Sequence, residues 1–413
     1  MRLEVDLALD KRRWLVIGAG ILANACCGAG YAFSVIKGPL MTVLGRTDPE
    51  VSLAYSLSVV FLPAGMLLAG AISARRGPRF AIALGGIVFG AGMLLAGFSR
   101  SLVWLYATYG AMVSVGQGLS YGTVIATAVR WFPDRRGLAS GLVVSALGVG
   151  TLVVAPLYQA MIGNDPTRVM YALKALGIGF VITVGTASRF VTDPPKDYAP
   201  TPGAEQAEPT GACGPEEETE WRQALARPFF WTLFALYALG TFSGHMVLTQ
   251  ASGIAQKITL LTATAASFVV GLLGVANAAG RLFWGGISDR IGRLTALASM
   301  SAITAAVMLI LPELALHRGG LIAGFALILL CYGGCLGTFP SLCADAFGSK
   351  NLAVNYALLF VAFGVAGVCG PRVGALLLER TGSYSAGCAV AAATAGVGLL
   401  VSLGLRLRRR RSP

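Results

Sequence analysis

Charged residues are scarce in this chain. Only 12% of its 413 residues are Asp, Glu, Lys or Arg, whereas 55% are hydrophobic, and the mean hydropathy is +0.71. A soluble core cannot bury that much apolar surface, so much of it must face lipid. The alternation of apolar and polar residues that marks outer-membrane β-strands is also missing. The sequence therefore predicts an all-α membrane protein.

Motifs of soluble enzymes are missing as well. The sequence has no phosphate-binding G-x-x-x-x-G-K-[ST] loop and no cluster of residues at metal-ligand spacing. G-x-G pairs recur because glycine is abundant, at 54 residues, and inside helices they indicate close packing. Most of the eight cysteines lie in apolar runs, as small buried hydrophobes do. We therefore expect no enzymatic activity, no cofactor, no metal and no disulfide.

Apolar runs recur along the whole chain, each near the ~20 residues that an α-helix needs to cross ~30 Å of hydrocarbon. A linker rich in proline and acid, DPPKDYAPTPGAEQAEPTGACGPEEETEW, separates six runs from six others. The first run is too long for a secretory signal and lacks a cleavage site, so we expect it to remain as a helix. The predicted spans are 14–36, 52–74, 79–98, 102–129, 137–161, 169–191, 229–254, 262–286, 294–312, 319–343, 352–378 and 386–405.

The positive net charge of +13 is distributed unevenly. When successive loops are assigned to alternate sides, one side collects most of the cations, including Lys11, Arg12, Arg13 and the run from Arg406 to Arg411. Cytoplasmic loops of membrane proteins show this bias, so we expect a multi-pass protein of the cell inner (plasma) membrane, surrounded by lipid and binding no nucleic acid. The predicted organisation is a cytoplasmic N-terminus (1–13), an N-terminal six-helix bundle (14–191), a cytoplasmic linker (192–228), a C-terminal six-helix bundle (229–405) and a basic cytoplasmic tail (406–413).

The two halves repeat a short motif after their second span. Residues 70–79 read GAISARRGPR and residues 285–293 read GGISDRIGR, about half the chain apart. An internal duplication of a six-helix unit predicts two pseudo-repeats with a site near the midplane between them.

These paired loops resemble the cytoplasmic signature of the major facilitator superfamily. In that family the acid of the motif accepts hydrogen bonds from helix amides and from an arginine at the cytoplasmic gate. The resemblance implies a gating role for Asp289, Arg290 and Arg293 in the second copy. The first copy has Ala74 in place of the acid, so Arg76 is either a gating residue or a cytoplasmic cation that obeys the charge bias.

Further segments narrow the resemblance to one branch. RWFPDRRGLASG from Arg130, NAAGRLFWGGISDRIGR from Asn277 and NYALLFVAFGVAG from Asn355 are similar to the monocarboxylate-porter and oxalate/formate-exchanger group. Together with the start of the linker, the similarity covers nearly the whole chain. It implies transport of small organic anions.

Arg281 is the cation placed deepest in a predicted span. It lies eight residues before Asp289, which puts it about 12 Å inside the membrane at ~1.5 Å per residue. An arginine there costs from about +2.5 to above +10 kcal/mol unless it faces a cavity or a partner. Its planar fork matches a carboxylate, so we expect it to bind an anionic substrate. The alternative is that Arg281 snorkels to the surface or bonds helix carbonyls.

Other polar and aromatic residues accompany this arginine. Asn277 lies one helical turn from Arg281 and can orient its guanidinium. In the resembled family, oxalate exchangers have a second cation at the position of Phe363. Eukaryotic monocarboxylate porters have a lysine at the position of Val35 and an acid at the position of Asn277. With one central cation, a monocarboxylate fits better than a dicarboxylate. The predicted substrate-binding residues are Arg281, Asn277, Tyr332, Tyr121, Gln117, Tyr31 and Phe360, the tyrosines and Phe360 having interhelical packing as their alternative role.

His245 stands inside a predicted span and titrates near neutral pH in water. We interpret it as a cap of the outer end of its helix. The sequence thus predicts a secondary active transporter of a lactate- or pyruvate-like monocarboxylate, acting by alternating access as a functional monomer. The resemblance implies symport with a proton. A carboxylate exchanger is the alternative, and a membrane receptor is a more distant one.

Overall fold

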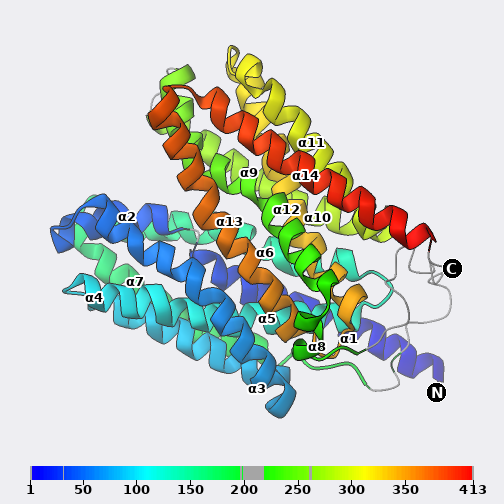
Figure 1. Cartoon of the computed structure of the whole chain (residues 1–413). Helices are drawn as coiled ribbons and strands as arrows, with labels where there is room; N and C mark the ends of the chain where they lie inside the picture. Colours follow the sequence, from blue (N-terminus) through cyan, green and yellow to red (C-terminus); the bar gives the residue numbers. More distant parts are fainter. Residues whose placement is uncertain (1, 31, 196–197, 199–217, 260–262, 412–413) are drawn as a thin grey trace. The chain divides into compact units, whose positions relative to one another are not determined.

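Every regular element in the described part of the computed structural model is a helix, as the sequence predicts (Figure 1). The structure describes residues 2–30, 32–195, 198, 218–259 and 263–411. Within them, ten stretches are long and apolar enough to cross a membrane. One of the ten, α3 (Asp48–Ala96), is interrupted at Gly77 and so holds two of the predicted spans. A further predicted span coincides with α10 (Ala263–Ile291), which carries Arg281.

The chain divides into two compact units, each of which is a helical bundle. The first comprises Met1–Gln206 with Gly348–Leu358, and the second comprises Ala207–Phe347 with Leu359–Pro413. The helices of the first unit are α1 (Arg2–Cys27), η1 (Gly28–Gly30), α2 (Phe33–Leu44), α3, α4 (Leu102–Leu105), η2 (Tyr106–Val113), α5 (Ser114–Trp131), α6 (Arg136–Ile162), η3 (Pro166–Arg168) and α7 (Val169–Ser188). Those of the second are α8 (Trp221–Ala226), α9 (Pro228–Thr259), α10, α11 (Arg293–Leu314), α12 (Arg318–Phe347), α13 (Leu352–Thr381), which starts in the first unit, and α14 (Tyr384–Arg411).

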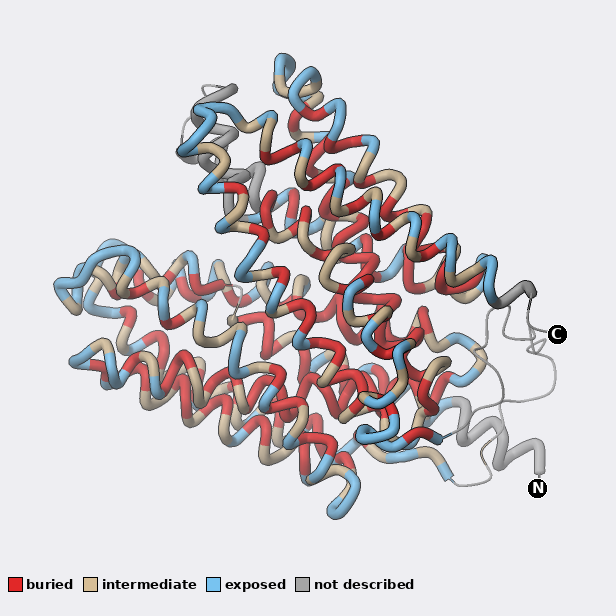
Figure 2. Tube along the Cα trace, viewed as in Figure 1, coloured by how far each residue is buried: buried red, intermediate tan, exposed pale blue. Residues whose placement is uncertain are grey.

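The outward faces of these helices are apolar. On α14, Val397, Leu400 and Leu407 recur at helical spacing and are 49%, 70% and 58% exposed. Ile178 and Ile182 on α7 are exposed in the same way. Figure 2 shows the pattern as buried positions on one side of a helix and exposed positions on the other. A face of this kind costs free energy in water and none in lipid, which is consistent with a bundle that spans the bilayer.

The first predicted span is broken rather than continuous. The apolar run 14–36 predicts one helix, but α1 ends at Cys27, and α2 begins only at Phe33 after a 3₁₀ turn. Two glycines in this turn, Gly28 and Gly30, lower the cost of leaving the helical conformation. The hydroxyl of Thr151 on α6 donates to the Gly28 carbonyl at 2.9 Å. That bond provides the partner that a carbonyl within a membrane needs at a helix break.

The repeated motif has the same backbone geometry in both units. Gly77 has φ 81° and ψ 167°, and Gly292, the equivalent position of the second copy, has φ 86° and ψ 146°. Any other residue would be strained at this φ. The internal repeat seen in the sequence therefore extends to the turn that joins the second and third spans of each half.

Candidate functional site

Arg281 is buried inside the second unit, with 3% of its surface exposed. Its Nε donates to Oδ1 of Asn277, one turn earlier on α10, at 3.3 Å. Helix α12 packs closely against this turn, because a Cβ at Gly333 would lie 2.8 Å from that same Asn277 oxygen. A guanidinium carries five N–H donors, and a carboxylate can accept two of them side by side. The turn from Asn277 to Arg281 thus forms an oriented cationic site within the bundle.

Tyr332 neighbours Gly333 on α12, but its ring points to α9. It lies against Gly244, where a Cβ would collide with the ring, and its centroid is 5.2 Å from that of His245. Only 3% of Tyr332 is exposed. The predicted wall residue Phe360 stacks on Phe363 of α13, with ring centroids 4.7 Å apart. These residues form an aromatic cluster of α9, α12 and α13, which we define as His245, Tyr332, Phe360 and Phe363.

His245 does not cap a helix end, so that interpretation is wrong. Helix α9 continues to Thr259, and the imidazole packs against Phe363 with ring centroids 4.5 Å apart. The apolar run ends soon after His245, which is why the sequence alone suggested a terminus there. The side chain is half-buried, and it belongs to the aromatic cluster.

The remaining predicted substrate-binding residues belong to the first unit. Gln117 and Tyr121 lie one turn apart on α5 and are 7% and 3% exposed. Gln117 packs against the broken first span, because a Cβ at Gly30 would lie 3.3 Å from its Oε1. Tyr31, at the same break, lies outside the described residues.

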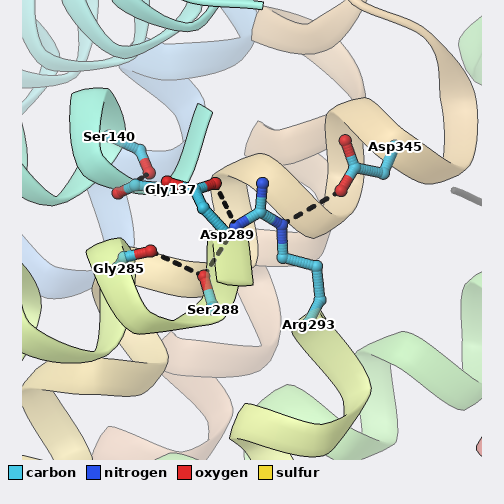
Figure 3. A network of polar contacts seen from close by, with 7 residues as sticks. All are labelled: Gly137, Ser140, Gly285, Ser288, Asp289, Arg293 and Asp345. Carbon is cyan, nitrogen blue, oxygen red and sulfur yellow. Dashed lines mark hydrogen bonds and ion pairs between the residues drawn. The ribbon is translucent and has the colours of Figure 1, made fainter. Parts of the chain in front are cut away.

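Arg293, a predicted gating residue, connects the ends of three helices in the second unit (Figure 3). Its Nη1 lies 2.6 Å from Oδ1 of Asp289, at the end of α10, and its Nε donates to Asp345, near the end of α12, at 3.0 Å. Nη1 also donates to the Ser288 hydroxyl at 2.6 Å, which in turn donates to the Gly285 carbonyl. We call Arg293, Asp289, Asp345 and Ser288 the arginine network. Because its ionic groups are mostly buried, removal of Arg293 would leave two carboxylates without the cation that they share.

The other two predicted gating residues are exposed and lie outside this network in the structure. Arg290 follows Asp289 on α10 and faces away from the bundle. The guanidinium of Arg76 on α3 lies over the ring of Phe80, with 4.8 Å between its central carbon and the ring centroid. That contact is a surface cation–π pair, worth about 0.5–1 kcal/mol.

Sequence reasoning missed two functional neighbours. Asp345 was not among the predicted gating residues, and His245 was not predicted to lie beside Tyr332. Both contacts join residues far apart in the chain, so no local spacing reveals them. The one available signal for His245 was its type, since a histidine inside an apolar span is costly and usually functional.

Comparison with known proteins agrees with this architecture. The chain matches the family model described as Major Facilitator Superfamily over residues 17–354 and again over 253–413. It is 28% identical over 376 residues to the oxalate:formate antiporter of Oxalobacter formigenes, covering 91% of this chain and 87% of the relative. It is 25% identical to monocarboxylate transporter 13 of Bos taurus, covering 94% and 89%.

A solved structure shows the same fold. The proton:xylose symporter XylE superposes with a TM-score of 0.70 at 14% identity, covering 95% of each chain. At that identity the likeness concerns the arrangement of helices and not the substrate.

Proposed function

Since this chain belongs to the major facilitator superfamily, and to its monocarboxylate and oxalate–formate branch, we propose that it carries a small monocarboxylate such as lactate or pyruvate by alternating access. It is a multi-pass membrane transporter and not an enzyme. One relative is named for oxalate and formate and another for monocarboxylates, which makes a small carboxylate the first class of substrate to test.

The observation that carries the proposal is the buried guanidinium of Arg281, oriented by Asn277. Since a negative charge stabilises a buried cation in a medium of low dielectric, the site favours an anion that enters it. The fork of Arg281 holds a carboxylate at two points, and Asn277 and the aromatic cluster provide polar and apolar contacts for the rest of a small organic acid. Gln117 and Tyr121, on α5 of the first unit, stay predicted substrate-binding residues.

Phe363 bears on whether the substrate has one carboxylate or two. Oxalate has two carboxylates, and the resemblance places a second cation at this position in oxalate exchangers. Here the position holds a phenylalanine that is 6% exposed and packs in the aromatic cluster. A dicarboxylate would bring an extra negative charge into an apolar setting, so a monocarboxylate is favoured.

The arginine network is proposed to act as a gate in the second unit. It ties the ends of α10, α11 and α12, and two of these helices, α10 and α12, meet at the candidate anion site. Asp289 and Arg293 would hold one state and release another when their helices separate. Arg290 and Arg76 fit better as cytoplasmic cations, and we propose that both termini and the linker face the cytoplasm of an inner (plasma) membrane.

Carboxylate exchange is the second candidate, because a matched relative is named an oxalate:formate antiporter. Symport with a proton and exchange differ in what drives net uptake. Purified protein in liposomes should take up labelled lactate without internal substrate, and more so when the outside is acid. Uptake that occurs only when the liposomes contain a carboxylate would favour exchange. If no monocarboxylate gives either uptake or counterflow, the proposed substrate class is rejected.

A further inference from the structure

His245 lies within the second unit rather than on its lipid face. Its ring contacts Tyr332 edge-on at 5.2 Å and Phe363 at 4.5 Å, both residues being almost fully buried. The residue keeps part of its surface exposed, while the Nε2 atom of its imidazole is buried. A buried imidazole nitrogen of this kind takes up a proton when water or a bound ligand reaches it from within the bundle.

The imidazole is fixed in one orientation. One ring N–H donates to the backbone carbonyl of Phe363, and the ring fills the space over Gly367 on α13. A Cβ at Gly367 would lie 3.2 Å from Cε1 of the ring, a tight contact, and at ordinary contact distance from the two ring nitrogens. In a neutral imidazole that donates from one nitrogen, the second nitrogen is the one that accepts a proton.

Helix α12 connects this histidine to the anion site. Tyr332 touches His245 on α9, and the next residue, Gly333, touches Asn277 on α10. His245 and Asn277 therefore contact neighbouring faces of the same turn of α12, and Arg281 packs one turn further along, at Gly337. The two positions are close in height along the bundle.

We propose that His245 is the proton-binding residue of the substrate site, and that its protonation is coupled to anion binding at Arg281. The inference rests on the proposed monocarboxylate transport. In the empty site a second positive charge near Arg281 is repelled, whereas a bound monoanion compensates it. Anion and proton then bind with positive coupling, and the coupling is reciprocal. One anion and one proton leave the net charge of the site unchanged, so the loaded and empty carriers cross with equal charge.

The groups around His245 support this assignment. The helices packed against α9 present these residues to it: Tyr332 and Cys335 on α12, Phe363 and Gly367 on α13, and Cys388 on α14. Helix α10 carries Arg281. The acids in the described parts of α10, α12 and α13 lie in their last turns, at Asp289, Asp345 and Glu379. Tyrosine, cysteine and arginine ordinarily titrate above physiological pH, whereas histidine is the residue type among these whose ordinary pKa lies between pH 5 and 8.

The test uses the full-length protein in liposomes and two readouts, with labelled lactate as the probe. The first readout compares net uptake under two conditions: with the outside one pH unit more acid than the inside, and with equal pH on both sides. It is given as the ratio of the first to the second. The second is counterflow at equal pH, which needs no net proton movement. For one-to-one symport the wild-type ratio approaches about tenfold per pH unit.

His245→Gln keeps a hydrogen-bond donor but cannot titrate, so its uptake ratio should fall close to one. Its counterflow should fall by no more than about fivefold, the worth of one ordinary hydrogen bond. Gly367→Ala crowds the ring and should give an intermediate ratio. His317→Gln alters the exposed histidine between α11 and α12 and should keep the wild-type ratio.

An unchanged ratio in His245→Gln would overturn the inference. So would an equal loss of both readouts in a folded variant, because that pattern reports a structural role. Wild-type counterflow without any pH stimulation would reject the coupling alone, whereas absence of wild-type counterflow with every monocarboxylate would reject the proposed function itself.

Discussion

At the scale of single residues, Arg281 is the side chain on which the proposed transport depends. Arg281→Lys keeps the charge but replaces a planar fork with a compact ammonium, which cannot hold a carboxylate at two points or bond Asn277 in the same way. Loss of one charge-assisted hydrogen bond costs about 1.5–3 kcal/mol, so affinity should fall roughly 10- to 100-fold. Lactate uptake in liposomes would measure this, with size-exclusion elution as the check on folding. Wild-type uptake by the lysine variant would remove Arg281 from the site.

Phe363 allows a test of the charge count. In Phe363→Lys a second cation stands beside Phe360 and can meet a second carboxylate, so oxalate should compete better against labelled lactate. The ratio of the two inhibition constants should shift toward oxalate by about tenfold, the worth of one charge-assisted contact. Phe363→Leu, which shortens the side chain without adding charge, should leave the ratio near that of the wild type. No shift in the lysine variant would mean that the number of cations does not set selectivity.

Residue positions were predictable from the sequence where the contact is local. The hydrogen bond from Arg281 to Asn277 agrees with their spacing on one helix, and it is present. The contacts of His245 with Tyr332 and of Arg293 with Asp345 join different helices. They depend on how α9, α11 and α12 pack, which a hydrophobicity pattern does not specify.

At the scale of elements, the turn at Gly292 is the feature most sensitive to substitution. Gly292→Ala places a Cβ at φ 86°. This should cost about 1–2 kcal/mol and lower the thermal midpoint of the purified protein in detergent. The matched control is Gly396→Ala in α14, where nothing lies within 4 Å of the added Cβ. A helical backbone makes that change neutral or slightly stabilising. Equal midpoints for the two variants would contradict the strain argument.

Element boundaries show what an apolar run can and cannot predict. The runs located the predicted spans, but they gave no sign that the first is broken at Gly28 or that α3 continues to Gly77 without a loop. Hydropathy averages over many residues, whereas a break is set by one or two glycines and by a distant partner such as Thr151. The charged segments 1–13 and 406–413 were predicted to lie outside the helical bundles. In the structure they continue the first and last helices, because α1 starts at Arg2 and α14 reaches Arg411.

At the scale of the whole molecule, the family and the two-unit architecture are predictable from composition, charge bias and the repeated motif. Substrate identity is not, because relatives with one fold differ in a few side chains inside it. The proposed orientation is testable with reporter fusions. A fluorescent protein attached after Pro413 should be fluorescent, and alkaline phosphatase at the same point should be inactive, since both termini are proposed to be cytoplasmic.

The control fusion for this orientation lies on the opposite side. Phosphatase joined after His317, in the turn between α11 and α12, should be active, because this turn is one span away from the proposed cytoplasmic surface. Active enzyme at Pro413 and inactive enzyme at His317 would invert the proposed topology.

The break in the first span provides a point at which α2 could change its angle to α1. Helix α2 has 12 residues, so it extends about 18 Å beyond the break at a rise of ~1.5 Å per residue. A pivot of about 10° at the 3₁₀ turn would move its far end by about 3 Å, roughly the width of a water molecule, without disturbing α1. The 3₁₀ turn is held to α6 by the hydroxyl of Thr151. Any change in the angle between α1 and α2 would therefore act on the hydrogen bond between Thr151 and Gly28.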